Sequence, residues 1–390
     1  MGVNDMTFEQ AATVLDAIYK QASGQSVLGA ITTNNFVSVA QTALKTGYDP
    51  LSTAISQVLS RTIFSIRPYT AKFKGLFTSP ERYGNHVRKI NYVDGAIEDD
   101  QRFSLVNGQS VDHYRVNSCE TVQTNFYGAN TYQRHTTIYK DQLDNAFSSA
   151  SAFSQFITGQ LQNVSDQLEQ VREQYARMTL CNFIAAKAYA DSGNILHLVT
   201  AYNAEAGTSL TSQTVLAPAN FVPFVKWLYG YIQTLAEFMS ERSVKYHQLI
   251  NGKAILRHTP LNRMKAYINT QFMNNIDSSV LSSVFHDERL KMIDYEPVNY
   301  WQSIDNPMNV TATPAYMASD GTVVEHTEPV ACENILGVMF DDEAAGVTLV
   351  NQWSATTPLN AAGGYTNTYW HETVRFWNDF SENFVVLALD

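Results

Sequence analysis

Apolar side chains recur every three or four positions between residues 152 and 190, the most regular pattern in the chain. The apolar positions are Phe153, Ile157, Leu161, Val164, Leu168, Val171, Tyr175 and Met178. This spacing places them on one face of an α-helix, with Ser151 available as the N-cap and Gly193 just beyond the end. Such a helix would be roughly 57 Å long. The pattern predicts one rod-like helix over 152–190, with a coiled coil as the alternative.

Residues 82–128 instead show the alternation typical of β-strands. Asp94-Gly95 and Asn107-Gly108 are strong turn signals, and strand-forming residues continue from Tyr114 to Phe126. The segment has few large aliphatic side chains, and an isolated two-stranded ribbon is marginally stable in water. We therefore expect an extended hairpin that needs a surface to lie on.

Residues 1–48 have the pattern of an arm with two short helices. Thr7 can cap the first helix, whose apolar face holds Phe8, Ala11, Val14, Leu15 and Ile18. The second helix is expected at 36–44, before a break at 47–50. Because the arm has too little apolar surface for its own core, we expect it to pack on the main body or on a neighbouring chain.

The rest of the chain mixes helical and strand patterns, which predicts an α/β region followed by a β-rich C-terminal part. The expected elements are a short helix and a strand within 51–81, two strands within 194–218, a helix at 220–242, a strand at 253–258, a helix at 259–273, short apolar elements at 280–285 and 291–295, and strands at 336–340, 347–350, 369–377 and 384–389.

Composition narrows the class of protein. Charged residues make up 16% of the 390, against about 25% in typical soluble proteins, which indicates that partners cover part of the surface. The net charge of −11 argues against a dedicated nucleic-acid-binding protein. The sequence has no signal-peptide pattern and no apolar stretch long enough to span a membrane. The odd set of Cys119, Cys181 and Cys332 predicts reduced thiols.

No motif for catalysis appears. The sequence lacks phosphate-binding glycine loops, a nucleophile elbow and closely spaced histidines that would bind a metal. The acidic runs at 98–100 and 341–343 are interpreted as solvated turns. We therefore predict no catalytic, cofactor-binding or metal-binding residue, and no enzyme activity.

The order of elements resembles the Hong Kong 97-type capsid fold of tailed bacteriophages: an arm, an extended hairpin, one long helix, an α/β lobe and returning C-terminal strands. Three segments resemble the major head proteins of small short-tailed Bacillus-type phages. They are residues 132–147, which lead into the long helix, residues 254–276, and residues 369–377 with the apolar strand that follows.

This resemblance implies an α+β fold with peripheral and axial domains. The implied division is an N-terminal arm at 1–48, the start of a peripheral domain at 49–81, an extended β-hairpin loop at 82–128, the peripheral domain with its spine helix (152–190) at 129–218, an axial domain at 219–333, and C-terminal strands at 334–390 that return to the peripheral domain.

The function implied by the resemblance is that of a major capsid protein. It would assemble in the bacterial cytoplasm, as pentamers and hexamers, into the icosahedral shell of the virion. Partners would be its own copies and a portal protein, with scaffold and decoration proteins left open. The packaged double-stranded DNA would be contacted only weakly and without sequence specificity. Another phage structural protein, such as a tail tube subunit, and an unrecognised cytosolic enzyme are the alternatives.

The charges of the hairpin suggest a contact with a neighbouring subunit. Basic residues precede the first turn, and acidic residues lie at or beyond it: Arg82, Arg88 and Lys89, then Asp94, Glu98, Asp99 and Asp100. A segment of segregated charge without a core fits a complementary surface on another copy, where charge fixes the register. A solvated, flexible hairpin is the alternative.

Overall fold

The computed structural model describes residues 8–24, 31–33, 35–45, 72–77, 86–95, 97–111, 114, 116, 118–127, 129–253, 255–279 and 295–390. The elements expected at 51–66 and 280–285, and nearly all of the one at 291–295, lie outside these residues. Thr7 and Arg82 lie outside them as well.

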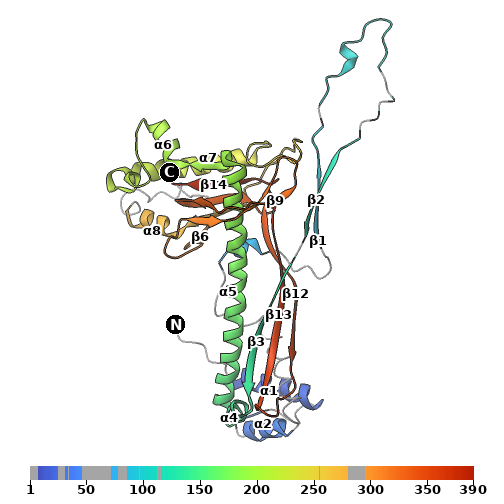
Figure 1. Cartoon of the computed structure of the whole chain (residues 1–390), viewed down its shortest axis with the longest axis vertical. Helices are drawn as coiled ribbons and strands as arrows, with labels where there is room; N and C mark the ends of the chain where they lie inside the picture. Colours follow the sequence, from blue (N-terminus) through green and yellow to red (C-terminus); the bar gives the residue numbers. More distant parts are fainter. Residues whose placement is uncertain are drawn as a thin grey trace.

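One long helix, α5 (Ala150–Ala190), runs along most of the molecule (Figure 1). It confirms the predicted rod, but its cap is Ser149 rather than Ser151: the Ser149 hydroxyl accepts a hydrogen bond of 3.1 Å from the Ala152 N–H. The predicted apolar face holds for Phe153 and Leu168, which are buried. Met178 is 43% exposed, so the prediction fails there.

The buried face of α5 changes because its neighbours change along its length. Near its start the helix packs against the N-terminal helices, and near its end it packs against a β-sheet. The buried apolar positions after Tyr175 are accordingly Ala176, Leu180, Cys181, Phe183, Ile184, Ala185 and Ala186.

A three-stranded antiparallel sheet lies beside α5 (Figure 1). Its order is β12-β13-β3, with bounds Ala345–Thr356, Tyr365–Asn378 and Asn130–Tyr139. Burial alternates along β13, as expected for a strand with one covered face.

One buried carboxylate joins α5 to all three strands of this sheet. Glu372 of β13 is fully buried, and it accepts hydrogen bonds from Arg172 of α5 (2.6 Å) and Gln352 of β12 (2.9 Å). The hydroxyl of Tyr132 on β3 donates a third. Burial alone would lower the pKa of Arg172, but the adjacent charge of Glu372 raises it. We call these four residues the Glu372 network.

A second, five-stranded sheet forms the core of a lobe at one end of the molecule (Figure 1). Its order is β4-β14-β11-β5-β6, with bounds Ile195–His197, Phe384–Ala388, Ile335–Asp341, Met264–Asn269 and Glu296–Val298. The β14–β4 and β5–β6 pairs are parallel, and the two pairs made by β11 are antiparallel.

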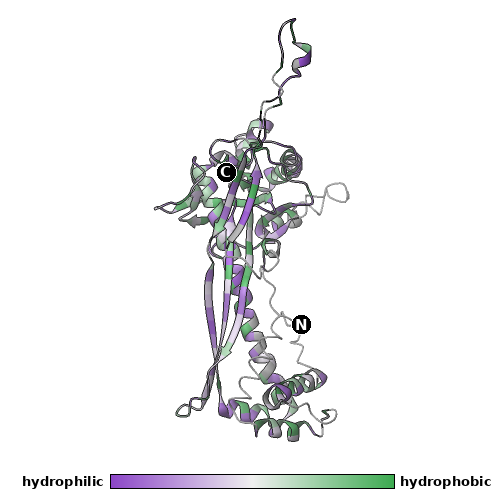
Figure 2. Cartoon of the chain, turned by 90° about the vertical axis from the view of Figure 1, so that its right-hand side faces the viewer, coloured by the Kyte–Doolittle hydropathy of each residue, from purple (hydrophilic) through white to green (hydrophobic). Residues whose placement is uncertain are grey.

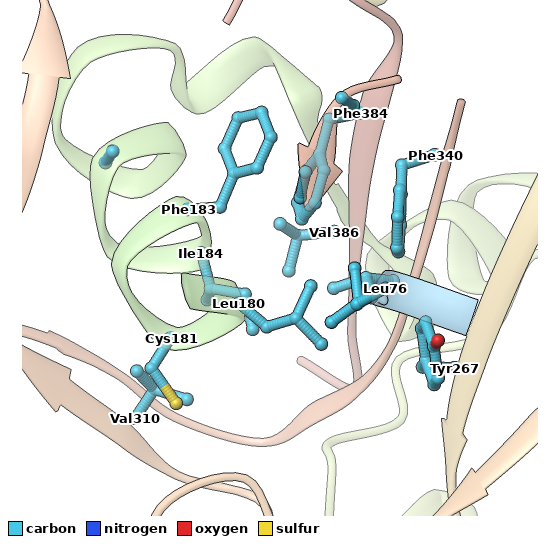
Figure 3. Close-up of a cluster of buried hydrophobic side chains, with 14 of the residues drawn as sticks. Leu76, Leu180, Cys181, Phe183, Ile184, Tyr267, Val310, Phe340, Phe384 and Val386 are labelled. Carbon is cyan, nitrogen blue, oxygen red and sulfur yellow. The ribbon is translucent and has the colours of Figure 1, made fainter. Parts of the chain in front are cut away.

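Both faces of this sheet are buried, which explains why β11 and β14 are apolar without alternation. The C-terminal half of α5 covers one face, where Phe183 stacks on Phe384 with ring centroids 3.8 Å apart (Figure 3). Val385 and Leu387 point to the other face. That face is covered by α6 (Leu198–Ala206), α7 (Pro218–Ser240) and α8 (Thr270–Ser279).

Several expectations for this region were wrong. Within 194–218, only β4 is a strand, and helix α6 follows it directly. In the expected strand at 253–258, Lys253 and Arg257 form isolated bridges with Ile250 and Ser243 instead. Residues 264–269, expected in a helix, form β5 because they pair with both β11 and β6. Among the C-terminal strands, β12 and β13 lie along α5 and β11 and β14 belong to the five-stranded sheet, while the expected domain division at 334–390 stays a prediction.

The N-terminal helices α1 (Phe8–Ser23) and α2 (Phe36–Leu44) pack on the main body, the first of the two expected surfaces. They surround the start of α5 together with α4 (Lys140–Ala146). Phe36 meets Phe153 edge to face at 5.6 Å. The smaller elements are η1 (Lys74–Leu76), η3 (Ser192–Asn194), η4 (Thr214–Leu216), β7 (Val310–Ala312), β8 (Ala315–Met317), β9 (Val323–Glu325) and β10 (Val330–Cys332).

Candidate inter-subunit contact site

A two-stranded ribbon projects from the molecule. Strands β1 (His86–Tyr92) and β2 (Thr121–Tyr127) pair antiparallel over their whole length. The chain between them extends far beyond the lobe (Figure 1). The expected hairpin is therefore present, although its second strand begins at Thr121 rather than near Tyr114.

The hairpin tip, defined here as residues 97–111 with Tyr114 and Val116, exposes an unusual number of large apolar side chains. Ile97 is 101% exposed and Phe103 is 89% exposed. Leu105, Val106, Val111, Tyr114 and Val116 are exposed too. The tip stands clear of the rest of the molecule when the view is turned by 90° (Figure 2). Apolar side chains gathered on one projecting segment are typical of a protein contact.

A short turn, η2 (Gln101–Phe103), gives the tip a defined local shape. The carboxylate of Asp100 accepts hydrogen bonds from the Arg102 backbone N–H (3.0 Å) and from Arg102 Nε (2.7 Å). These bonds lower the pKa of Asp100. The Arg102 guanidinium also lies over the Phe103 ring, 5.7 Å from its centroid. Asp100 thus shapes the turn that carries Phe103.

Two of the predicted contact residues also have partners within the subunit, and their contact with a neighbouring subunit stays a prediction. Lys89 lies 2.9 Å from Asp379 and 3.0 Å from Glu343, and it also pairs with Glu382. Asp94 accepts hydrogen bonds from Arg242 (2.6 Å) and from the Leu256 N–H (2.7 Å). Both residues therefore join the hairpin to its own lobe.

The other predicted residues fall into two groups. Arg88, Glu98 and Asp99 are exposed on the hairpin, where another chain can reach them. Asp100 is paired locally with Arg102.

The acidic turn at 341–343 is less solvated than expected, because Asp341 is buried and Arg263 binds Asp342 at 2.6 Å.

The sequence reasoning missed the apolar tip and the carboxylates that bind Lys89. A signal for the tip was present, since exposed positions between two turn signals carried Phe103, Leu105 and Val106. No local sequence signal indicates that Asp379 or Glu382 binds Lys89.

In the described part of the chain, no group of His, Cys, Asp and Glu side chains could hold a metal ion, and no helix is long and apolar enough to cross a membrane.

A long helix beside a three-stranded sheet, a lobe built on a mixed sheet and a projecting hairpin together match the fold of solved phage capsid structures. The fold matches the capsid structure of Staphylococcus phage Andhra with a TM-score of 0.53 and 10% identity, over 83% of this chain and 85% of that one. A chain in a structure of the head fiber and inner core protein of bacteriophage P68 matches with a TM-score of 0.52 and 8% identity, over 83% and 86% of the two chains.

The family follows from the sequence itself. The model of the Phi29-like phage major capsid protein family matches residues 15–388, so the chain belongs to that family. A search of curated proteins finds no match. The chain is thus the major capsid protein of a tailed phage, a structural component of the virion capsid that assembles with copies of itself, and its α+β fold is of the Hong Kong 97 type.

Proposed function

We propose that the chain forms pentamers and hexamers that assemble in the bacterial cytoplasm and close into an icosahedral shell around double-stranded DNA. Within each shell the hairpin tip docks on a neighbouring subunit. The observation that carries this proposal is the exposure of Ile97, Phe103 and Val106 in a segment without a core. Burying such side chains against another copy removes apolar surface from water, at about 25 cal/mol per Å².

Charge has a second role in this contact. Arg88, Glu98 and Asp99 lie on exposed parts of the hairpin, where opposite charges on a neighbour would guide the register more than add affinity. We propose the portal protein as a further partner, with scaffold and decoration proteins as possible additional ones. We also propose that the subunit is divided into a peripheral and an axial domain. The net charge of −11 supports weak, salt-sensitive contact with the packaged DNA.

Shell yield tests the docking of the tip. Phe103→Ala should lower the yield of shells in electron microscopy and sedimentation, while the melting of the unassembled chain stays unchanged. Phe238→Ala is the matched control, because Phe238 is also an exposed phenylalanine, 56% accessible, but lies on α7 of the lobe. Normal shells from Phe103→Ala would contradict the proposal.

The charge contribution needs its own variant. Arg88→Glu should reduce shell yield most strongly at low salt, where Coulomb interactions are least screened. An equal yield at low and high salt would remove Arg88 from the contact while leaving the apolar tip in place. For DNA, tight and sequence-specific binding of a short duplex in a gel-shift experiment would contradict the weak contact proposed here.

A further inference from the structure

The base of the hairpin is fixed to its own lobe at two levels. At the first, Lys89 of β1 meets Asp379, Glu382 and Glu343. At the second, just beyond the paired strands, Asp94 binds Arg242 and the Leu256 N–H, and Glu120 binds Lys253. We call these contacts the hairpin anchor.

The second level holds both sides of the ribbon against one part of the lobe. Asp94 follows β1 and Glu120 precedes β2, and the Val93 N–H donates a hydrogen bond of 2.9 Å to the Glu120 carbonyl between them. Their partners Arg242, Lys253 and Leu256 all lie in the segment between α7 and β5. Ion pairs this exposed contribute little energy each, so they favour one orientation without holding it alone.

At the first level, Lys89, Asp379 and Glu382 are withdrawn from water, so breaking their pairs costs more than breaking the exposed pairs of the second level. The side chain of Lys89 is 17% exposed, and those of Asp379 and Glu382 are 2% and 7% exposed. Burial alone would lower the pKa of Lys89, but Asp379 and Glu382 outweigh it and raise that pKa. For the carboxylate of Glu343 burial acts in the opposite direction and would raise its pKa, but Arg263 and Lys89 lower that pKa to about 2.

The buried carboxylates around Lys89 need a cation to balance their charge. Arg257 contacts Glu382 at 3.1 Å, and the Ser381 N–H and hydroxyl bind Asp379. With the hairpin swung away, Glu382 would keep Arg257, but the buried carboxylate of Asp379 would lose the cation that lies 2.9 Å from it, and breaking a buried ion pair is costly. The ribbon has no core of its own to oppose such a swing.

We propose that Lys89 is a positioning residue: bound by Asp379, Glu382 and Glu343, it fixes the direction in which the hairpin leaves the subunit before any neighbour is present. The role differs from that of the tip, which meets the neighbour. A hairpin held in one direction loses less conformational freedom when it docks.

Distance measurements on the full, unassembled chain test this role. Cys119 is the exposed cysteine and lies in the hairpin loop, whereas Cys181 and Cys332 are buried. With Glu237→Cys on α7 as the second site, two spin labels report the distance between the hairpin and the lobe. The unchanged anchor should give one narrow distance peak, and Lys89→Gln should broaden and shift it.

Arg88→Gln is the matched control, since Arg88 is the neighbouring cation on β1 and is exposed. It should keep the narrow peak. If Lys89→Gln retains that peak as well, or only lowers the melting temperature of the lobe, the proposal is overturned. The readout needs no shell, so its outcome is independent of whether the tip docks on a neighbour.

A second variant covers the case in which Lys89→Gln does not fold. Glu343 has a side chain that is 49% exposed, so Glu343→Gln removes one partner of Lys89 without leaving a deeply buried charge unpaired. A broader distance peak in this variant supports the proposal. An unchanged peak overturns it.

Discussion

The lobe and the hairpin both contain paired antiparallel strands, yet their apolar side chains meet opposite environments. Every residue of β11 and β14 is buried, because α5 covers one face of the lobe sheet and α6 to α8 cover the other. The described residues of the hairpin tip have no covering layer, and Phe103 and Ile97 there are exposed. Apolar residues thus stabilise the subunit in the lobe, whereas in the hairpin they are available to another subunit.

Replacing a phenylalanine by alanine in the lobe and in the hairpin tip should give the largest difference in the free energy of unfolding. Phe384→Ala removes a fully buried ring that stacks on Phe183 at 3.8 Å, and we expect a loss of about 3–5 kcal/mol in the free energy of unfolding. Phe103→Ala should change it by less than about 0.5 kcal/mol. Urea unfolding of the unassembled chain measures both values, and comparable losses would show that the tip belongs to the core.

The Glu372 network should give the next largest effect. Glu372→Gln removes one of the two carboxylates that bind the guanidinium of Arg172, whose side chain is 14% exposed, and leaves Glu169 at 3.0 Å. A loss of about 2 kcal/mol is expected, because a buried hydrogen bond between two charged groups is replaced by one to a neutral amide. Glu328→Gln makes the same chemical change at an exposed position and should be nearly neutral. Similar stability of both variants in urea would mean that the network does not join α5 to the sheet.

Sequence patterns predicted the elements that are specified locally. The long helix and the two N-terminal helices follow from their own periodicity, and the final strand follows from its continuous run of apolar residues. Strand β5 was missed because Thr259 and Pro260 resemble a helix start, while the actual state of residues 264–269 depends on pairing with β11 and β6. Helix α6 was missed because its β-branched and aromatic residues favour a strand in isolation.

The contact site shows the same limit. The hairpin and its exposed charges could be predicted, because turn signals and alternation are local. The role of Lys89 could not, since Asp379 lies 290 positions further along the chain. Only the fold brings these residues together, and their proximity is the observation from which we propose Lys89 as an anchor of the hairpin.

A smaller effect is expected at the start of α5, where two serines compete as caps. Ser149→Ala should cost about 1 kcal/mol, because the Ala152 N–H loses its acceptor. Ser151→Ala is the control: Ser151 lies inside the helix and is exposed, so alanine should be neutral or slightly stabilising there. Thermal unfolding of the two variants distinguishes them, and the reverse order would restore Ser151 as the cap.

The smallest perturbation is chemical labelling of the three native cysteines, because it needs no substitution. Their reactivity compares the accessibility of the lobe with that of the hairpin. Burial raises the pKa of Cys181 to about 12, although Arg177 opposes it, and burial raises the pKa of Cys332 to about 11. The thiolate is the reactive form, so a raised pKa means that both lobe thiols stay protonated at pH 8. Cys119 is exposed in the hairpin.

Mass spectrometry after alkylation at pH 8 should therefore find one modified cysteine, Cys119, in the folded chain and three in urea. Rapid labelling of Cys181 without denaturant would show that the lobe opens readily, and the contrast between a closed lobe and an accessible hairpin would then fail.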